Sequence, residues 1–269
     1  MKLSIVLSIQ NASFSALAYK GQWAKNIGKI AGIGYDGVEL AVRDPQSLDM
    51  HTLKSILAKY HLPVPAIGTG QAFGEEGLSF THPEVSVRRQ AIERIKLHIG
   101  LAKKLGAVII IGLIRGRRGT NVNEGQAEEW LIEALRECAL ENNSVKLAVE
   151  PINRYETNLI NTAASAMKLV EKVKMENVGL LLDTFHMNVE EPSITESIIS
   201  GKDRLFHFHV ADSNRWYPGA GHIDFKAIFN TLAEIQYTGF VSAEILPLPD
   251  SDTAAKKTID FLRELLTKK

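Results

Sequence analysis

Residues 178–186 read VGLLLDTFH, a nearly continuous apolar run that ends in an aspartate and, three residues later, a histidine. Continuous hydrophobicity is typical of a parallel strand that is buried on both faces. Seven other short runs share this character, and longer stretches with apolar residues at three- and four-residue spacing separate them. The eight runs are residues 3–7, 37–40, 64–67, 107–111, 146–149, 178–182, 205–210 and 240–243.

Eight such units in 269 residues predict a (β/α)₈ TIM barrel, an α/β fold, as a single domain over residues 1–269. We expect helices at residues 92–105, 130–139, 163–173, 225–235 and 254–266, and a shorter one at 192–200. A doubly wound open sheet is the alternative. The first apolar run is followed by Ser8-Ile9-Gln10-Asn11-Ala12, without the glycine fingerprint of a dinucleotide site, which favours the barrel.

The composition narrows the class of protein. The chain has 31 basic and 31 acidic residues and so lacks the basic excess with which nucleic-acid binders neutralise phosphates. Its single cysteine, Cys138, cannot form an internal disulfide. No apolar run reaches the ~18 residues of a membrane span, and the N-terminal run is short for a signal peptide. We therefore expect a cytoplasmic protein with no nucleic-acid or membrane partner.

Polar residues stand at the ends of four consecutive runs. Glu150 follows the fifth run, Asp183 the sixth, His209 lies near the end of the seventh, and Glu244 follows the eighth. In a TIM barrel these strand ends meet at the face where chemistry occurs. A single carboxylate there could be a helix cap or an ion-pair partner. Three carboxylates together would repel one another without a cation, so the set predicts a metal site.

Three carboxylates and one imidazole favour Mn²⁺, Mg²⁺ or Co²⁺, with Zn²⁺ also possible. An octahedral ion held by four side chains keeps two positions for an adjacent carbonyl and hydroxyl of a sugar. The ion would polarise the carbonyl and acidify the proton on the neighbouring carbon, so that an enediolate can form. Two carboxylates on opposite faces of that carbon could invert it, whereas a single group moving the proton between carbons would isomerise an aldose and a ketose.

Residues 150–156 (EPINRYE), 183–186 (DTFH), 209–215 (HVADSNR) and Glu244 resemble the ketose 3-epimerases related to D-tagatose 3-epimerase, in the xylose-isomerase-like barrel superfamily. The resemblance covers essentially the whole chain. It implies that Glu150 and Glu244 are both metal ligands and the acid/base pair, and that Asp183 and His209 complete the metal site. It also implies that Glu156, His186 and Arg215 bind substrate oxygens.

Residues 66–72 (AIGTGQA), 111–118 (IGLIRGRR) and 212–216 (DSNRW) carry a closer resemblance, to the 5-keto-L-gluconate epimerases of inositol catabolism. That subfamily interconverts 5-keto-L-gluconate and D-tagaturonate, which differ at the carbon beside the ketone. Arg115 lies in the loop after the fourth run, and an arginine fork suits a carboxylate, so we expect Arg115 to bind the substrate's carboxylate. A solvated basic loop is the plainer interpretation.

Several alternatives stay open at this point. An unphosphorylated ketose such as D-tagatose or D-psicose would use the same metal site, as would hydroxypyruvate isomerase. Residues 244–250 (EILPLPD) offer neither glycines nor cations for a phosphate, which disfavours sugar phosphates. The third and fourth runs end without histidine, unlike the three-metal site of endonuclease IV. A ligand-binding barrel would need no acid/base pair. We also expect a homo-oligomer, a dimer or a tetramer.

Two further residues of this region have structural interpretations. His207 shares a strand face with His209, and we expect it to pack or hydrogen-bond inside the barrel rather than to bind metal. Glu39 ends the second run, where it could support the metal ligands from behind. Asp224 reads as the N-cap of the following helix.

Overall fold

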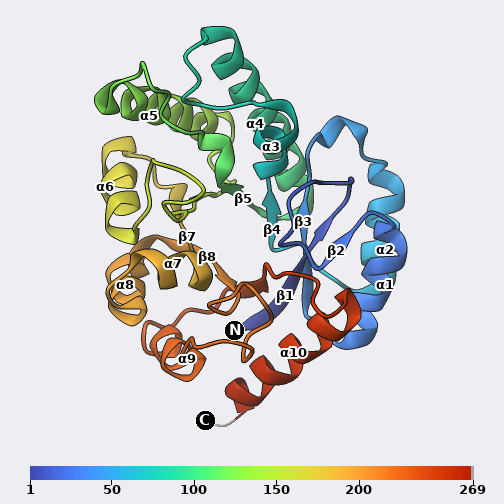
Figure 1. Ribbon diagram of the computed structural model, residues 1–269. Helices are drawn as coiled ribbons and strands as arrows, with labels where there is room; N and C mark the ends of the chain where they lie inside the picture. The colour runs from blue at the N-terminus through green and yellow to red at the C-terminus, as the bar shows by residue number, and fades with distance from the viewer. Residues whose placement is uncertain (268–269) are drawn as a thin grey trace.

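The computed structural model describes residues 1–267 and consists of a closed barrel of eight parallel strands surrounded by helices (Figure 1). The strand order follows the chain, and pairing of the first strand with the last closes the sheet. The barrel strands are β1 (Lys2–Ser8), β3 (Gly37–Ala41), β4 (Ala66–Gly68), β5 (Val108–Ile111), β6 (Leu147–Val149), β7 (Val178–Asp183), β8 (Leu205–Val210) and β9 (Phe240–Ala243). The predicted TIM barrel is confirmed.

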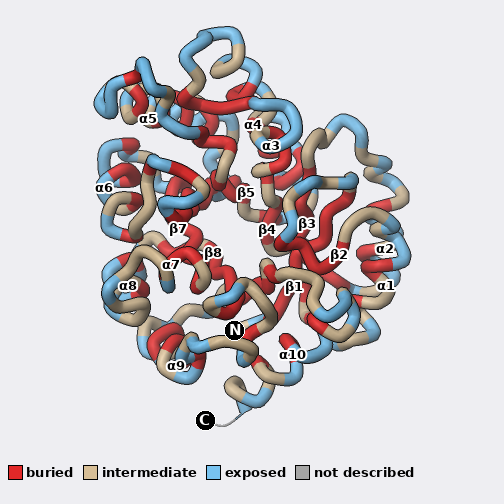
Figure 2. Tube along the Cα trace, in the orientation of Figure 1, coloured by how far each residue is buried: buried red, intermediate tan, exposed pale blue. Residues whose placement is uncertain are grey.

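The helices form an outer ring and present their apolar faces to the strands (Figures 1 and 2). They are α1 (Trp23–Ile33), α2 (Met50–Tyr60), α3 (Gly70–Glu76), α4 (Val85–Leu105), α5 (Glu124–Glu141), α6 (Ala163–Val173), α7 (Thr184–Glu190), α8 (Ile194–Gly201), α9 (Phe225–Glu234) and α10 (Ser251–Thr267). Three short 3₁₀ helices lie at Pro45–Ser47, Leu113–Arg115 and Lys202–Arg204. None of the helices in residues 1–267 is both long and apolar enough to cross a membrane.

The helix boundaries follow local capping chemistry. Thr162 caps α6 in a reciprocal capping box with Ser165. Asp224 accepts a hydrogen bond from the backbone N–H of Ala227 at the start of α9, which confirms the predicted N-cap. Gly106 ends α4 in the left-handed conformation, with φ of 72°.

One strand was absent from the sequence prediction. β2 (Tyr19–Lys20) pairs with the end of β1 outside the barrel closure. Two residues are too few to show a periodicity, so no pattern could have revealed it. The strand holds the segment between β1 and α1 against the mouth of the barrel, and Phe14 from this segment reaches the site described below.

The pairing of β7 with β8 contains a register shift between Leu180 and Leu181. Beyond the shift, Asp183 is the direct partner of His209. An irregularity of this kind re-aims side chains at the rim of a barrel. Here it brings a carboxylate and an imidazole from neighbouring strands to the same height.

Candidate active site

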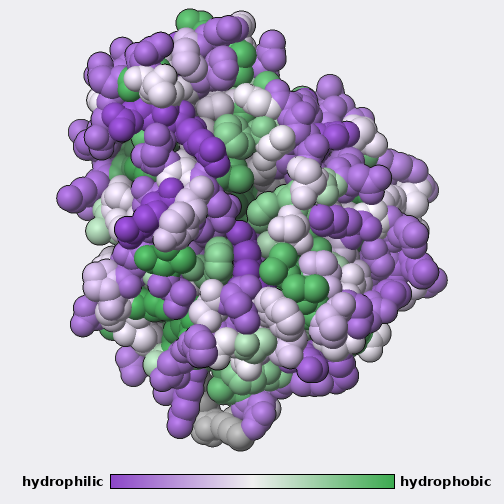
Figure 3. Space-filling view, viewed as in Figure 1, coloured by the Kyte–Doolittle hydropathy of each residue, from purple (hydrophilic) through white to green (hydrophobic). Residues whose placement is uncertain are grey.

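The C-terminal ends of the strands surround a cavity of about 330 Å³. Its wall combines the ends of β6, β8 and β9 with the segments that follow β1, β4 and β5. Figure 3 shows hydrophilic and hydrophobic side chains side by side around the centre of this face. The cavity is large enough for a small sugar, and the lining mixes charged groups with apolar surface, as is typical of small-molecule sites.

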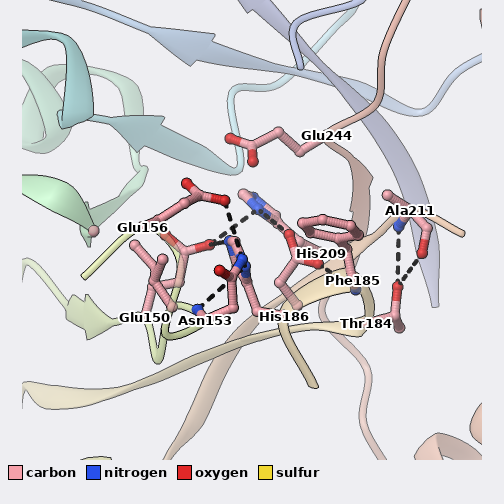
Figure 4. A network of polar contacts seen from close by, with 12 residues as sticks. Glu150, Asn153, Glu156, Thr184, Phe185, His186, His209, Ala211 and Glu244 are labelled. Atoms are coloured by element: carbon pink, nitrogen blue, oxygen red, sulfur yellow. Dashed lines mark hydrogen bonds and ion pairs between the residues drawn. The ribbon is translucent and has the colours of Figure 1, made fainter. Parts of the chain in front are cut away.

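The four predicted metal ligands meet at this cavity. One ligand atom from each of Glu150, Asp183, His209 and Glu244 lies within 4.8 Å of the other three. Nδ1 of His209 is 3.7 Å from Oδ2 of Asp183 and 3.9 Å from Oε1 of Glu150. Figure 4 shows Glu150 and Glu244 approaching the group from different sides.

Three of the four candidate ligands have a buried atom without a hydrogen-bond partner among residues 1–267. This holds for Oε1 of Glu150, Oδ2 of Asp183 and Nδ1 of His209. Leaving a buried acceptor unpaired is costly, and native proteins do so rarely. Three unpaired atoms that face one another are the arrangement expected for ligands of a cation. The donor set, mostly carboxylate oxygens, fits a hard divalent ion.

Behind His209, Glu39 fixes the orientation of the imidazole. Nε2 of His209 lies 3.0 Å from Oε1 of Glu39, and Nε2 of His207 lies 2.7 Å from Oε2. The carboxylate accepts a hydrogen bond from Nε2–H of His209, so Nδ1 is the ring nitrogen that faces Glu150 and Asp183. This is the usual way in which an outer carboxylate sets the tautomer of a metal-binding histidine. The predicted hydrogen-bonded role of His207 agrees with this geometry.

The electrostatics of the cluster reflect crowding of carboxylates in a dry site. Burial, followed by repulsion from Glu244, raises the pKa of Glu150 to about 8. Burial also raises the pKa of Glu244 to about 6, although His209 and Arg215 oppose the increase. Burial opposes ionisation of Asp183 too, but the neighbouring imidazoles of His209 and His186 hold its pKa below the usual range. A cation would remove the conflict between Glu150 and Glu244.

Arg215 joins two carboxylates that line the cavity, those of Glu156 and Glu244. Nη1 donates to Oε1 of Glu156 at 2.8 Å, and Nη2 donates to Oε2 of Glu244 at 2.9 Å. The guanidinium lies 4.9 Å from the ring centroid of Phe14 and 4.7 Å from that of Phe185. Arg215 itself adopts a left-handed backbone conformation, with φ of 61°. The surrounding loop therefore fixes the side chain where it can contact both carboxylates.

His186 faces the cavity as a neutral hydrogen-bond donor. The side-chain amide of Asn153 donates to Nδ1 at 2.8 Å, so the ring proton lies on Nε2, which is 3.8 Å from Oε1 of Glu150. Burial lowers the pKa of His186 to about 4, and the nearby Arg215 adds to this effect. A neutral imidazole at this place can donate to an oxygen of a bound molecule. The same Asn153 amide also donates to Glu156 at 3.1 Å.

The structure does not bring Arg115 to the cavity with the other candidate residues. Its side chain is fully buried and donates to the backbone carbonyls of Gly112, Leu159 and Ile160. The guanidinium therefore holds the loop after β5 against the loop after β6. In this position it does not face the cavity, where we expected it to bind the carboxylate of a substrate. Arg117 strengthens the same contact by donating to the carbonyl of Glu156.

Three residues that line the site or support it had no role assigned from sequence. Phe14 packs on Arg215, Gln71 lines the cavity and Asn153 orients His186 and Glu156. Asn153 lies within the EPINRYE motif, and its position between two candidate residues was a usable signal. Phe14 and Gln71 lie in segments without a periodic pattern, and only the fold shows their relation to the site.

Comparison with known proteins agrees with this geometry. The family model of the xylose isomerase-like TIM barrel matches residues 27–265. A D-psicose 3-epimerase of Ruminiclostridium cellulolyticum is 31% identical over 81% of this chain and 76% of its own length. An L-ribulose 3-epimerase of Methylomonas sp. is 29% identical over 93% of this chain and 95% of its own length.

A solved structure is similar along its full length. D-psicose 3-epimerase from Clostridium cellulolyticum H10, crystallised with D-tagatose, superposes with a TM-score of 0.84 at 25% identity and covers 99% of both chains. These relatives are enzymes that act on sugars, in contrast to the ligand-binding barrel considered above. The chain therefore belongs to the xylose isomerase-like TIM barrel family, among its sugar epimerases.

Proposed function

We propose that this enzyme inverts the carbon next to the ketone of an unphosphorylated keto sugar, with Glu150 and Glu244 as the two acid/base groups. The observation that carries the proposal is the pair itself. The carboxylates of buried Glu150 and partly buried Glu244 follow non-adjacent strands, β6 and β9, and in the metal-free protein their pKa values of about 8 and about 6 lie near neutral pH. Groups with such pKa values exchange protons efficiently at physiological pH.

In this proposal one glutamate removes the proton from the carbon beside the carbonyl, which gives an enediolate. The other glutamate returns a proton on the opposite face, so the centre is inverted. A divalent ion held by Glu150, Asp183, His209 and Glu244 would supply Lewis-acid polarisation of the carbonyl. His186 donates from Nε2 to a substrate oxygen, and Arg215 and Glu156 orient the hydroxyls beside the reacting carbon.

The finer proposal for the substrate is a keto-uronate, the pair 5-keto-L-gluconate and D-tagaturonate. Each of the three stretches that carry the closer resemblance reaches the cavity with part of its residues. They contribute to its wall Gly68, Thr69, Gly70, Gln71, Gly112, Leu113 and Arg215. A substrate preference that differs within the family would be encoded in such lining segments.

A neutral ketose is the second candidate, and a different observation favours it. Among the cavity-lining residues that the structure describes, Arg215 is the only arginine or lysine, and Glu156 and Glu244 already pair with it. The relatives described above are named for neutral ketoses. D-tagatose and D-psicose are the ketoses that we propose for this alternative.

The experiment is an NMR assay in D₂O of the Mn²⁺-loaded enzyme with D-tagaturonate, D-tagatose and D-fructose in parallel. Conversion of the keto acid with deuterium incorporated, and little change in the ketoses, supports the keto-uronate. Conversion of the ketoses instead supports the second candidate. Absence of both exchange and conversion for all three would refute the proposed reaction.

Three accompanying proposals concern the state of the enzyme. We infer that the native ion is Mn²⁺, with Co²⁺, Mg²⁺ or Zn²⁺ as alternatives, because the donors are mostly oxygen. We also propose a homo-oligomer, a dimer or a tetramer, in the cytoplasm. Metal analysis of enzyme purified without added ions and light scattering of the same sample test the first two, and cell fractionation tests the third.

A further inference from the structure

The wall of the cavity beyond β4 contains a buried amide oxygen that has no hydrogen-bond partner. Gln71 lies in the first turn of α3, is 6% exposed and lines the cavity. Its Oε1 has no hydrogen-bond partner among residues 1–267. The catalytic carboxylates follow β6 and β9, so this oxygen belongs to a different part of the barrel mouth. Buried acceptors are rarely left unpaired, which makes the atom a candidate contact for a ligand.

A hydrogen-bond chain fixes which end of the amide faces the cavity. Nε2 of Gln71 donates to the hydroxyl of Ser8 at 2.7 Å, and that hydroxyl donates to the carbonyl of Gln10. A serine hydroxyl has one proton, so it can only accept from Gln71. Rotation of the amide by 180° would place two acceptors against each other. Oε1 is therefore held as the group without a partner.

The neighbouring polar side chains of this wall are already engaged. The hydroxyl of Thr69 donates to the carbonyl of Ile110 at 2.6 Å. The carboxylate of Glu75 accepts from the backbone N–H and the hydroxyl of Ser13 at 2.8 and 2.7 Å. The Thr69 hydroxyl and Oε1 of Glu75 are thus each paired within the protein, whereas the buried Oε1 of Gln71 is not.

We propose that Gln71 is a specificity-determining residue, which accepts a hydrogen bond from a hydroxyl of the keto sugar that takes no part in the reaction. This inference rests on the proposed function and names a feature of its substrate. An amide oxygen attracts a hydroxyl proton, and it repels a carboxylate, which has no proton to donate. The substrate end beside Gln71 therefore carries a hydroxyl, in a keto-uronate as well as in a neutral ketose.

The test compares Gln71→Met with the wild type. Methionine keeps the length and shape of the side chain but has no amide. The probe is whichever of D-tagaturonate, D-tagatose and D-fructose the enzyme converts, together with the analogues that lack one non-reacting hydroxyl each. With the wild type, we expect kcat/KM for one deoxy analogue to be about tenfold lower than for the parent sugar. Gln71→Met should lower kcat/KM for the parent sugar by a similar factor. With this variant, kcat/KM should be the same for the parent sugar and for that analogue.

Two matched variants separate this role from general damage to the cavity. Ser8→Ala removes the anchor of the amide, so we expect part of the same loss of discrimination. Thr69→Val removes a hydroxyl that is used within the protein, and it should change the parent sugar and the analogue by the same factor. Equal effects of Gln71→Met on the parent sugar and every analogue would overturn the inference, while conversion by the wild type would leave the proposed function standing.

Calorimetric binding of D-tagatose and its analogues gives a readout that needs no turnover. A wild-type enzyme that converts no keto sugar refutes the proposed function. In that case, binding that depends on one hydroxyl and on Gln71 would still support the contact. Absence of binding would overturn the inference together with the function.

Discussion

The two halves of the barrel interior are built from the same parallel sheet but have opposite chemistry. Between β4 and β7 the interior is apolar and contains Ala66, Ile110, Ala148 and Leu181, each 4% exposed or less. Around β1, β3, β8 and β9 it contains buried polar residues, which are Ser4, Glu39, His207, His209 and Ser242. Two of these, Ser4 and Ser242, have hydroxyl oxygens without a partner.

The difference between the two halves shows where the fold buries polar groups that cost stability and that support the candidate active site. Apolar side chains in the first half gain free energy from burial without any requirement for a partner. The second half buries a carboxylate and two imidazoles, which is tolerable only because Glu39 pairs with both histidines. Burial would raise the pKa of Glu39, but His209 and His207 keep it below the usual range. The polar half thus orients His209, which we propose as a metal ligand.

The largest expected effect comes from the two carboxylates at the strand ends above these halves. Glu150→Gln and Glu244→Gln should each lower turnover by about 10²–10⁴-fold, because an amide neither exchanges a proton nor ligates an ion like a carboxylate. Turnover by NMR and thermal unfolding of the same samples measure the loss and the fold. Glu137→Gln, on the outer face of α5, is the control and should keep full turnover. Near-normal turnover of either cavity variant would contradict the two-base scheme.

In the apolar half we expect a loss of stability without a loss of metal binding. Leu181→Ala removes a fully buried side chain from the cluster with Ala66, Ile110 and Ala148. Such a substitution costs about 2–5 kcal/mol of unfolding free energy, since it leaves a void in a packed core. Denaturant unfolding of the metal-free protein measures the cost, and calorimetry measures the affinity for Mn²⁺. A large fall in affinity would show that the two halves are coupled rather than separate.

The same contrast explains what could be predicted from sequence. The eight strands and the four candidate ligand positions could be found in the sequence because each is a local feature, an apolar run with a polar residue at or after its end. The direction of the Arg115 side chain could not be predicted, because its partners Leu159 and Ile160 lie more than 40 residues away along the chain. Gln71 and Ser8 are 63 residues apart, so their contact depends on the closed barrel. Contacts that depend on closure leave no periodic signature in sequence.

The polar half should respond to the loss of its buried charge. Glu39→Gln keeps the shape of the side chain but removes the negative charge that orients His209 through Nε2. Changes in such outer carboxylates typically reduce metal affinity by about 10–100-fold. Titration of the metal-free protein with Mn²⁺ measures the effect. Glu75→Gln, which removes a carboxylate of the same cavity that lies outside the ligand cluster, should leave the affinity unchanged. Equal affinities for Glu39→Gln and wild type would mean that packing alone orients His209.

Measured per pH unit, the smallest expected effect is the pH dependence of metal binding, and its sign follows from Glu150. In the metal-free protein its pKa is about 8, above the ordinary 4.5, so the neutral carboxyl predominates at pH 7. The fold favours this neutral form, and the metal-free protein should therefore lose stability as the pH rises from about 4.5 to about 8. An ion requires the carboxylate and must displace the proton.

Affinity for Mn²⁺ should accordingly rise up to about tenfold per pH unit below pH 8 and level off above it. Calorimetry at pH 7 in two buffers of different ionisation enthalpy counts the protons released per ion. These come from Glu150 and from His209, whose pKa Glu39 and Asp183 hold above its usual range against the effect of burial. The same titration of Glu150→Gln should release about one proton fewer, since one of the residues that hold a proton is gone. Unchanged proton release in that variant would assign the proton to another group, with Glu244, whose pKa is about 6, as the next to test.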